Sequence, residues 1–461
     1  MLFSGIPFLY YFLPCVLILY FLIPKSLKNG FLLLSSLLFY AWGEPRYVIL
    51  MVAAIVLFYS FGLAIGASKK IWLRKLWLTA AIVTGCIMLG VFKYADFALD
   101  NWNKLTGMSV PLLRLALPIG ISFYTFQCIS YAVDVYRKDV QPQRNLIHFG
   151  TYVALFPQLI AGPIVRYVDV AAELNDRQSQ WEDVARGLGL FLLGLGKKVL
   201  LANPLGELTS IFRQTTEQSV LFYWLYAVAF MLHIYFDFAG YSEMAIGLGR
   251  IFGFRFPRNF DYPYISRSIT EFWRRWHMTL GGWFRDYVYI PLGGNRVGRL
   301  KWLRNILAVW LLTGLWHGAA WNFVVWGLLF AVCLLAEKLL PLQKLPNMVR
   351  HGYVLLIVLI SFVIFNARDL AQAGQDIAGM FGGLGLPLSS APAVYYLRSY
   401  GVLLLAGIIG ATPLPYRLFH RAAQRWPKVT WLLPVGAMAL LLVCTAYLVD
   451  GSFNPFLYFR F

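Results

Sequence analysis

The most constraining feature of this sequence is a series of apolar runs long enough to cross a lipid bilayer. A spanning helix needs about 20 mostly apolar residues, and its backbone polar groups must bond one another because hydrocarbon offers no partners. The chain is 59% hydrophobic and only 13% charged over 461 residues. Candidate runs lie near residues 7–24, 29–43, 48–67, 76–95, 112–132, 146–165, 183–201, 217–250, 305–336, 352–366, 398–412 and 430–449. We therefore predict an all-α polytopic membrane protein with about 10 to 12 transmembrane or re-entrant helices.

The charges that flank the first runs predict the orientation of the chain. No basic residue precedes the first run, whereas Lys25 and Lys28 follow it, so we expect a retained anchor and not a cleaved signal peptide. The loop at 44–46 has no net charge, and the next loop, at 69–75, carries four lysines or arginines. Because basic loops stay in the cytoplasm, we predict that the N-terminus lies outside.

The formal net charge of +19 raises the question of nucleic acid binding. The basic residues are spread over juxtamembrane loops, and no segment is long enough for a soluble reader domain, so we expect anionic membrane lipids as partners and no nucleic acid. The sequence contains no Walker A lysine, Rossmann glycine fingerprint, CxxC pair or metal-type histidine pairing. We accordingly expect no metal and no bound cofactor.

Residues 250–304 break the apolar pattern, with 11 arginines or lysines against three acids and many aromatic residues. A continuous helix would place His277 at the centre of one face, and Arg274 and Arg285 at its edge could bind phosphates bidentately. The predicted face consists of Thr270, Trp273, His277, Leu280 and Phe284. The alternative is an amphipathic interfacial helix whose arginines hold only lipid phosphates. That alternative does not explain a histidine on the apolar face.

A second histidine, His317, lies within residues 309–321, which we predict to form one uninterrupted apolar helix. Gly314 and Gly318 form a small-xxx-small pair, which indicates close helix packing or leaves room for a tunnel beside His317. The structural alternative is a histidine that only bonds a neighbouring helix. Ionisable groups in a membrane are costly, so two such histidines make function the leading interpretation. Asp237, in the run at 217–250, either lines the same tunnel or belongs to a structural ion pair.

Three motifs carry a resemblance to a known family. RNFDYPYISRSITEFWRRWH at 258–277, WFRDY at 283–287 and GLWHG at 314–318 closely resemble the membrane-bound O-acyltransferase (MBOAT) family. LPIGISFY at 117–124, FPQLIAGP at 156–163 and YFDFAGYS at 235–242 also look like this family. The similarity is greatest to the branch of alginate O-acetyltransferase membrane subunits, with peptidoglycan O-acetyltransferases and teichoic-acid D-alanylation proteins as relatives.

The resemblance implies helices that surround a central tunnel, with His317 as the catalytic residue and His277 as the second tunnel residue. It covers about residues 1–335 of a single integral membrane domain, followed by C-terminal transmembrane helices at 336–461. It also implies substrate-binding neighbours, namely Trp273, Arg274, Arg275, Arg285, Asp286 and Trp316. The expected donor is acetyl-coenzyme A, whose phosphates would need the cations of the basic segment.

The chemistry of acetyl transfer agrees with these residue types. Moving an acetyl group from a thioester to an alcohol needs a base for the hydroxyl proton, and neutral imidazole is suited to that role near pH 7. A membrane interior disfavours imidazolium and would keep His317 neutral. Alternatively, imidazole itself carries the acetyl group for a time. The sequence leaves both roles of His317 open.

The expected function is membrane O-acetylation of an extracytoplasmic polysaccharide such as alginate, by a multi-pass protein of the bacterial inner membrane. Since the chain offers no second catalytic site for a bulky polymer, we expect an extracytoplasmic serine-type O-acetyltransferase as partner, as in the resembling systems. The alternatives are acylation of peptidoglycan or another cell-wall polymer and, more distantly, transport of a lipid-linked sugar. A transporter predicts internal repeats, and the two halves of the sequence show no convincing self-similarity.

Overall fold

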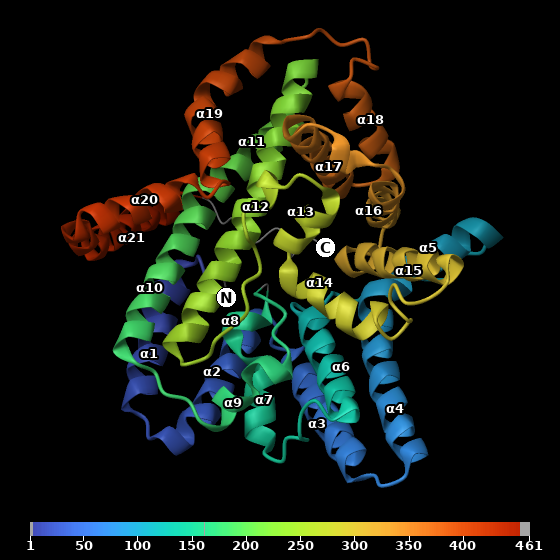
Figure 1. Cartoon of the computed structure of the whole chain (residues 1–461), viewed down its shortest axis with the longest axis vertical. Helices are drawn as coiled ribbons and strands as arrows, with labels where there is room; N and C mark the ends of the chain where they lie inside the picture. Colours follow the sequence, from blue (N-terminus) through green and yellow to red (C-terminus); the bar gives the residue numbers. More distant parts are fainter. Residues whose placement is uncertain (1–2, 161, 452–461) are drawn as a thin grey trace. The chain divides into compact units, whose positions relative to one another are not determined.

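The computed structural model describes residues 3–160 and 162–451, and every regular element in these ranges is a helix (Figure 1). Within them, seven helical stretches are long and apolar enough to cross a membrane. These are Val48–Ala67, Ile71–Thr106, Val220–Ile251, Trp321–Leu339, Asn347–Asn366, Ala391–Gly410 and Pro427–Asp450. The shorter helix Phe8–Leu22 is also apolar. The prediction of an all-α polytopic membrane protein is confirmed.

Three of the predicted runs are not continuous helices. The run near 112–132 is helical only from Ile121, because Pro118 precedes it and Gly120 adopts a positive φ of 75°. The run near 146–165 divides into two helices around the non-helical Leu155. The run near 305–336 is interrupted at Gly318, whose backbone is fully extended. A glycine or proline lies at or near each of these breaks, and hydropathy alone did not predict the breaks.

The chain divides into two compact units. The first comprises Met1–Phe191 and Tyr241–Arg258. Its elements are η1 (Phe8–Phe12), α1 (Leu13–Leu22), η2 (Lys25–Leu27), α2 (Lys28–Gly43), α3 (Val48–Ala67), α4 (Ile71–Leu89), η3 (Gly90–Tyr94), α5 (Ala95–Thr106), α6 (Ile121–Arg137), α7 (Leu146–Ala154), α8 (Phe156–Leu159), α9 (Tyr167–Asn175) and most of α10 (Trp181–Gly196). In this unit α3 packs on α4 and α6, and α2 packs on α7.

Polar side chains connect helices within the first unit. Thr151 donates to the carbonyl of Asn29 at 2.9 Å, and the Asn29 amide donates to the carbonyl of Leu174 at 2.7 Å. The guanidinium of Arg177 lies 4.5 Å from the ring centre of Phe254 and donates to the carbonyl of Phe252 at 3.0 Å. These contacts join α2, α7, α9 and the segment after α12 (Val220–Ile251).

The second unit comprises Leu192–Gly240 and Asn259–Phe461 and holds both histidine motifs. Its elements are η4 (Lys197–Ala202), α11 (Asn203–Gln214), most of α12, η5 (Pro263–Ile265), α13 (Ile269–Arg275), α14 (Met278–Phe284), η6 (Arg285–Tyr289), α15 (Arg299–His317), α16 (Trp321–Leu339), η7 (Leu342–Lys344), α17 (Asn347–Asn366), α18 (Leu370–Met380), α19 (Ala391–Gly410), α20 (Leu414–Arg425), η8 (Pro427–Trp431) and α21 (Leu432–Asp450). The prediction of one membrane domain stays a prediction, and its expected internal boundary after residue 335 lies within α16.

Helices α15 and α16 pack closely on each other in the second unit, and glycines permit the approach. A Cβ atom on Gly314 would lie 2.4 Å from the Phe323 carbonyl oxygen, and one on Gly327 would lie 2.3 Å from the Trp310 carbonyl oxygen. A Cβ atom on Gly318 would lie 2.2 Å from the Phe323 ring. The close-packing interpretation of the Gly314 and Gly318 pair is confirmed, and Phe323 fills the space beside these glycines.

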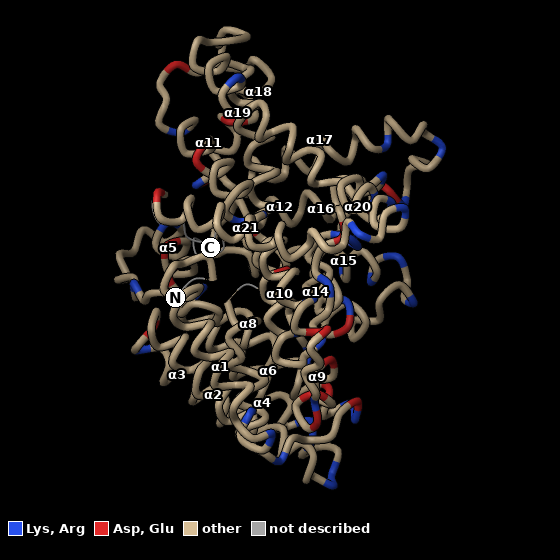
Figure 2. The backbone as a smooth tube through the Cα atoms, turned by 90° about the vertical axis from the view of Figure 1, so that its left-hand side faces the viewer, with Lys and Arg blue, Asp and Glu red and all other residues tan. Residues whose placement is uncertain are grey.

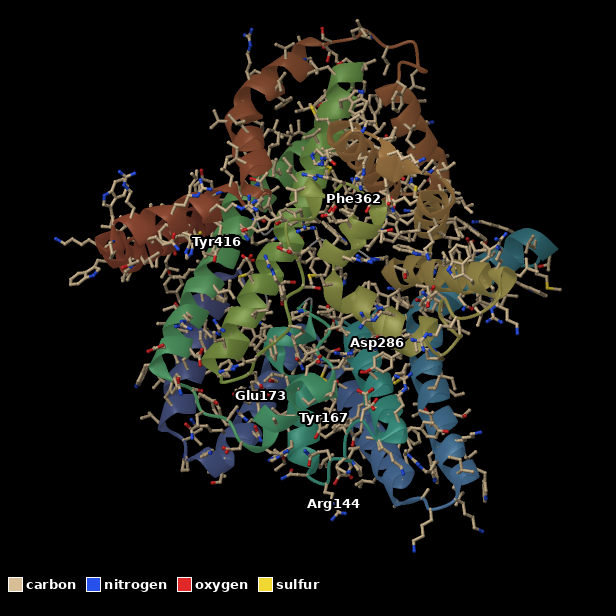
Figure 3. All side chains as sticks on the ribbon, in the orientation of Figure 1. Arg144, Tyr167, Glu173, Asp286, Phe362 and Tyr416 are labelled. Atoms are coloured by element: carbon tan, nitrogen blue, oxygen red, sulfur yellow. The ribbon has the colours of Figure 1, made fainter. Side chains whose placement is uncertain are left out.

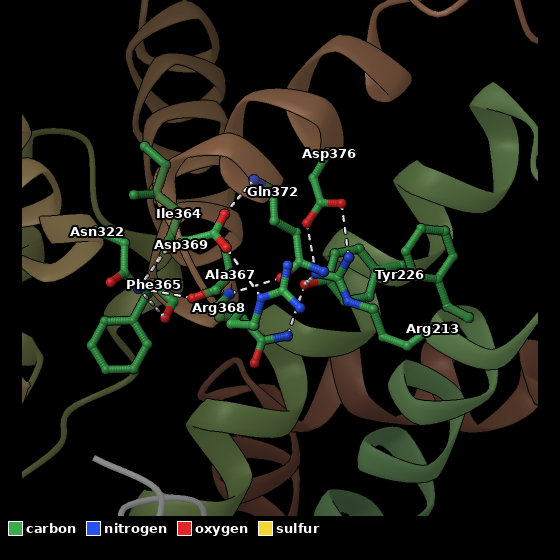
Figure 4. Close-up of polar contacts among 12 residues, drawn as sticks. Arg213, Tyr226, Asn322, Ile364, Phe365, Ala367, Arg368, Asp369, Gln372 and Asp376 are labelled. Carbon is green, nitrogen blue, oxygen red and sulfur yellow. Dashed lines mark hydrogen bonds and ion pairs between the residues drawn. The ribbon is translucent and has the colours of Figure 1, made fainter. Parts of the chain in front are cut away.

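An ion pair fixes α18 against α11 within the second unit (Figure 4). Arg213 donates from both terminal nitrogens to the two carboxylate oxygens of Asp376, at 2.8 and 2.6 Å. It also donates to the Tyr226 hydroxyl at 2.7 Å, and that hydroxyl accepts from the Asn366 amide at 2.7 Å. Because Asn366 is the last residue of α17, the network fixes the end of that helix as well.

Charged residues are distributed as a membrane protein requires. Long stretches of the backbone carry no charge, and many of the lysines and arginines occur in loops and at helix ends (Figure 2). Helix α20 is the clearest charged element, with Arg417, Arg421 and Arg425 on its exposed surface. Such a distribution keeps ionised groups out of the hydrocarbon.

Candidate active site

The WRRWH motif lies at a break between two short helices. Helix α13 ends at Arg275, Trp276 is extended, and His277 adopts a left-handed backbone with φ 43° and ψ 51° before α14 begins at Met278. The predicted single helical face from Thr270 to Phe284 is therefore wrong. A left-handed conformation is uncommon for a residue with a Cβ and needs support from its surroundings.

Backbone hydrogen bonds to the preceding loop cause this break. The Asp261 amide donates to the Arg275 carbonyl at 2.9 Å, and the Met278 amide donates to the Asn259 carbonyl at 2.9 Å. These two bonds flank His277 and take the places of helical bonds. The loop at 259–261 thus decides the local conformation, which periodicity within residues 269–284 cannot reveal.

The imidazole of His277 is almost fully buried, with 1% of its surface exposed. Its Nδ1 lies 3.1 Å from the side-chain oxygen of Asn259. The ring packs against Phe238 at 4.6 Å and against Trp316 at 5.6 Å between centroids. Its Nε2 is buried and has no hydrogen-bond partner among the described residues. Burial lowers the pKa of His277 to about 3, so the ring is neutral near pH 7.

His317 is the last residue of α15. The prediction of one uninterrupted helix over residues 309–321 is therefore wrong. Its ring is 2% exposed and lies against three aromatic rings. The centroids of Trp316, Trp326 and Phe365 are 4.8, 4.9 and 5.3 Å from its own. Trp316 contacts both imidazoles, so the structure brings the two histidine motifs together on one indole ring.

The end of α17 is bonded to α16 beside His317. The Asn322 amide donates to the carbonyl of Ala367 at 2.9 Å, immediately beyond α17 (Figure 4). Phe365 precedes that carbonyl by two residues and contacts Phe323 and Trp326 as well as His317. Asn322 therefore supports one wall of the aromatic cage around His317.

The remaining candidate residues differ in their exposure and in their partners. Arg274 is exposed, whereas Arg275 donates to Glu271 at 3.0 Å and to the Asp261 carboxylate at 3.2 Å. Arg285 is exposed and forms an ion pair with Asp286 (labelled in Figure 3) at 2.7 Å, at the start of η6. Arg275 thus has internal partners that the sequence did not indicate.

Trp273 packs in an aromatic cluster with Trp310, Trp326 and Phe330 at centroid distances of 4.7, 5.7 and 4.9 Å. Since Trp326 also contacts His317, this cluster connects α13 to the histidine at the end of α15. Substrate binding by Trp273, Trp316 and the arginines stays a prediction.

A second buried polar group lies in α12. The Asp237 carboxylate forms an ion pair with the ammonium group of Lys198, and both side chains are at most 2% exposed. Gly240 permits this contact, because a Cβ atom there would lie 2.7 Å from the Gly194 carbonyl oxygen. Of the two interpretations of Asp237, the structure favours the ion pair. A lysine in the neighbouring run at 183–201 was the available sequence signal.

Comparison with known proteins identifies the family of this chain. The model of the membrane-bound O-acyltransferase family matches residues 76–367, a range that includes both histidine motifs. The chain belongs to the membrane-bound O-acyltransferase family. As a member of this family, it is a multi-pass membrane acyltransferase.

Curated relatives within this family extend the similarity. A probable alginate O-acetylase of Azotobacter vinelandii is 39% identical over the full length of both chains. A peptidoglycan O-acetyltransferase of Helicobacter pylori is 32% identical over 100% of this chain and 98% of the relative. A teichoic acid D-alanyltransferase of Bacillus subtilis is 33% identical over 46% of this chain and 57% of the relative. The predicted resemblance is confirmed, and it extends beyond residue 335.

Sequence reasoning missed Asn259 and Asn322 among the residues around the two histidines of this family member. Asn259 stands 18 residues before His277, and its own motif was recognised without a role for the amide. Asn322 follows the Gly318 break, whose position hydropathy did not reveal. A neutral amide carries no charge and no helical periodicity, so only the tertiary contacts single these residues out.

Proposed function

We propose that this acyltransferase takes acetyl from cytosolic acetyl-coenzyme A and passes it to hydroxyls of an extracytoplasmic polysaccharide such as alginate. The transfer proceeds through an extracytoplasmic serine-type acetyltransferase partner. The full-length similarity to a probable alginate O-acetylase supports this acceptor class. The bacterial inner membrane, with the N-terminus outside, is the proposed location.

The observation that carries the proposal is that two buried imidazoles contact the same indole ring, that of Trp316. His277 and His317 both contact this indole ring, at 5.6 and 4.8 Å between centroids. Both rings are buried, and burial lowers the pKa of His277, so that this ring is neutral near pH 7. An imidazole that can take up and release a proton near pH 7 suits proton transfer from an alcohol to a thiolate leaving group.

The reaction needs one base and one positioning group. His317 is proposed as the base that removes the hydroxyl proton while the alcohol oxygen attacks the acetyl carbonyl carbon. The carbon–sulfur bond then breaks, and the thiolate recovers the proton as the free thiol. His277, with its buried Nε2, positions the reacting group by accepting a hydrogen bond. A transient acetyl group on His317 itself is the competing route.

The donor end of the site is proposed to use exposed guanidinium groups. Arg274 and Arg285 are exposed in the segment that carries His277 and can meet the phosphates of coenzyme A. Arg275 is bonded to Asp261 and Glu271, so its proposed contribution is to hold the backbone on which Arg274 stands. No bound cofactor or metal is required by this chemistry.

The experiment uses the purified full-length protein in detergent with acetyl-labelled acetyl-coenzyme A. Release of the coenzyme A thiol and transfer of label are measured in the presence of the acceptor or the partner protein. His317→Ala is expected to lower turnover by at least about a hundredfold, the usual contribution of a general base. His420→Ala is the matched control, since His420 is exposed on α20 and lies outside the site.

A folded His317→Ala protein that still transfers the label at the wild-type rate would contradict the catalytic assignment. The acceptor is tested separately with alginate fragments and peptidoglycan fragments. Because the Helicobacter pylori relative is a peptidoglycan O-acetyltransferase, label on peptidoglycan alone would replace alginate as the proposed acceptor. Rapid-quench isolation of label on His317 would favour the acyl-carrier route over the base.

A further inference from the structure

We infer that Asn259 is a positioning residue that fixes His277 in the tautomer with hydrogen on Nδ1 and the lone pair on Nε2. The inference rests on the proposed function, because it states which nitrogen of His277 faces the reacting groups. Asn259 reaches the ring directly, with its side-chain oxygen 3.1 Å from Nδ1.

The hydrogen bonds of Asn259 identify the atom that faces His277. The same side-chain atom accepts from the Thr279 backbone amide at 3.3 Å and from the Thr279 hydroxyl at 2.9 Å. A backbone N–H only donates, so its partner must be the amide oxygen and not the amide nitrogen. An oxygen next to Nδ1 can only accept, and Nδ1 must therefore carry the hydrogen. Neutral imidazole then has its lone pair on Nε2.

The surroundings prevent the ring from reversing this arrangement. Phe238 packs edge to face on the imidazole at 4.6 Å, Trp316 lies at 5.6 Å, and Phe260 lies at 6.4 Å. The backbone of His277 is fixed on both sides by the bonds to residues 259–261. A flipped ring would place a carbon next to the Asn259 oxygen and would lose the hydrogen bond. One ring orientation and one tautomer are therefore favoured together.

The consequence concerns the buried nitrogen on the other side of the ring. Nε2 has no hydrogen-bond partner among the described residues, and a buried polar atom without a partner is costly. With the lone pair there, Nε2 can accept from an O–H or S–H group of a bound substrate. With the other tautomer it would donate instead and could not take up a proton. Asn259 thus decides whether His277 is an acceptor or a donor.

Three variants separate this role from simple capping of α14. Asn259→Asp keeps an oxygen for Nδ1 and Thr279 but adds a negative charge that favours imidazolium. Asn259→Leu removes the oxygen and frees the tautomer. Thr279→Ala is the matched control, because it removes one hydrogen bond to the same oxygen and leaves the Nδ1 bond in place.

The kinetic readout is the pH profile of kcat together with KM for acetyl-coenzyme A. Asn259→Asp is expected to raise the pKa of His277 from its low value, so that kcat falls at acidic pH values at which the wild type is still active. Asn259→Leu is expected to lower kcat roughly ten- to a hundredfold with little change in KM. Thr279→Ala should keep the wild-type profile. If Asn259→Asp keeps the wild-type profile and Asn259→Leu keeps wild-type kcat, the inference is wrong.

A spectroscopic readout tests the tautomer without reference to activity. Protein labelled with ¹⁵N-histidine contains six histidines, and the spectrum of His277→Ala assigns the signals of His277 by difference. We expect a protonated Nδ1 and an unprotonated Nε2 in the wild type, and a mixture in Asn259→Leu. A protonated Nε2 in the wild type would overturn the inference. Full turnover by His277→Ala with the expected spectrum would instead contradict only the proposed function of His277.

Discussion

The two histidine regions of the second unit are built differently. His277 stands in a left-handed break between α13 and α14, where hydrogen bonds to the oxygens of Asn259 and bonds of the flanking backbone determine its geometry. His317 stands at the end of α15, where Trp316, Trp326 and Phe365 surround its ring. Polar contacts at His277 determine which ring nitrogen carries the hydrogen. Aromatic packing at His317 determines where the ring lies.

This difference agrees with the proposed roles of the two histidines, positioning by His277 and proton transfer by His317. The hydrogen bond between His277 and Asn259 determines which nitrogen of His277 carries the hydrogen. A group that positions a substrate needs the same arrangement at every turnover. The aromatic rings around His317 restrict the position of its imidazole, which is proposed to gain and lose a proton. Substitutions that exchange these properties, or remove one of them, test the comparison directly.

The largest effect is expected from substituting both histidines. His317→Gln and His277→Gln should each lower kcat by roughly a hundredfold or more, within the range of general acid–base catalysis. If the rings act as one unit on Trp316, the double variant will be no more than about tenfold slower than the slower single variant. Single-turnover transfer of labelled acetyl measures this. Multiplicative losses would mean that the two regions act independently.

The aromatic cage should be more important for stability than any single polar contact. Phe365 is 1% exposed, so Phe365→Ala should lower the free energy of unfolding by about 3 to 5 kcal/mol through lost burial and the cavity that remains. Phe381→Ala is the control, because Phe381 is 58% exposed in the same unit. Thermal unfolding in detergent compares the two variants. Equal melting temperatures would show that the cage contributes little to folding.

The adjacent arginines should separate donor binding from local structure. Arg274→Gln should raise KM for acetyl-coenzyme A roughly tenfold with little change in melting temperature, because loss of a phosphate contact of about 1.4 kcal/mol costs that factor. Arg275→Gln should instead lower the melting temperature, since Asp261 and Glu271 lose their partner. An unchanged KM in Arg274→Gln would remove Arg274 from the donor site.

The smallest effect concerns the pH dependence of stability. The pKa of His277 falls from 6.5 to about 3 on folding, so the unfolded chain binds the proton more tightly between these values. Stability from the buried neutral ring is complete above pH 6.5 and decreases as the pH falls toward 3. The loss is at most about 1.4 kcal/mol per pH unit. Between pH 7 and pH 5, the melting temperature should therefore fall more steeply with decreasing pH for the wild type than for His277→Gln. Equal slopes of melting temperature against pH would contradict this.

Much of the fold could be predicted from hydropathy alone. Runs such as those near 48–67 and 430–449 became the helices Val48–Ala67 and Leu432–Asp450, because a long apolar segment has one low-energy state in a bilayer. Hydropathy failed where a loop or a glycine controls the backbone. The extended Gly318 is apolar in sequence and still ends the helix that carries His317.

The sequence by itself determined the membrane class, the family and the two histidines, because apolar length and local motifs are properties of short segments. Only the tertiary structure decided the surroundings of those histidines. Asn259 meets His277 because the loop at 259–261 pairs with residues 275–278. Asn322 supports Phe365 because α16 packs on α17. Hydrogen-bond partners are set by how segments fold onto one another, and no local periodicity encodes that.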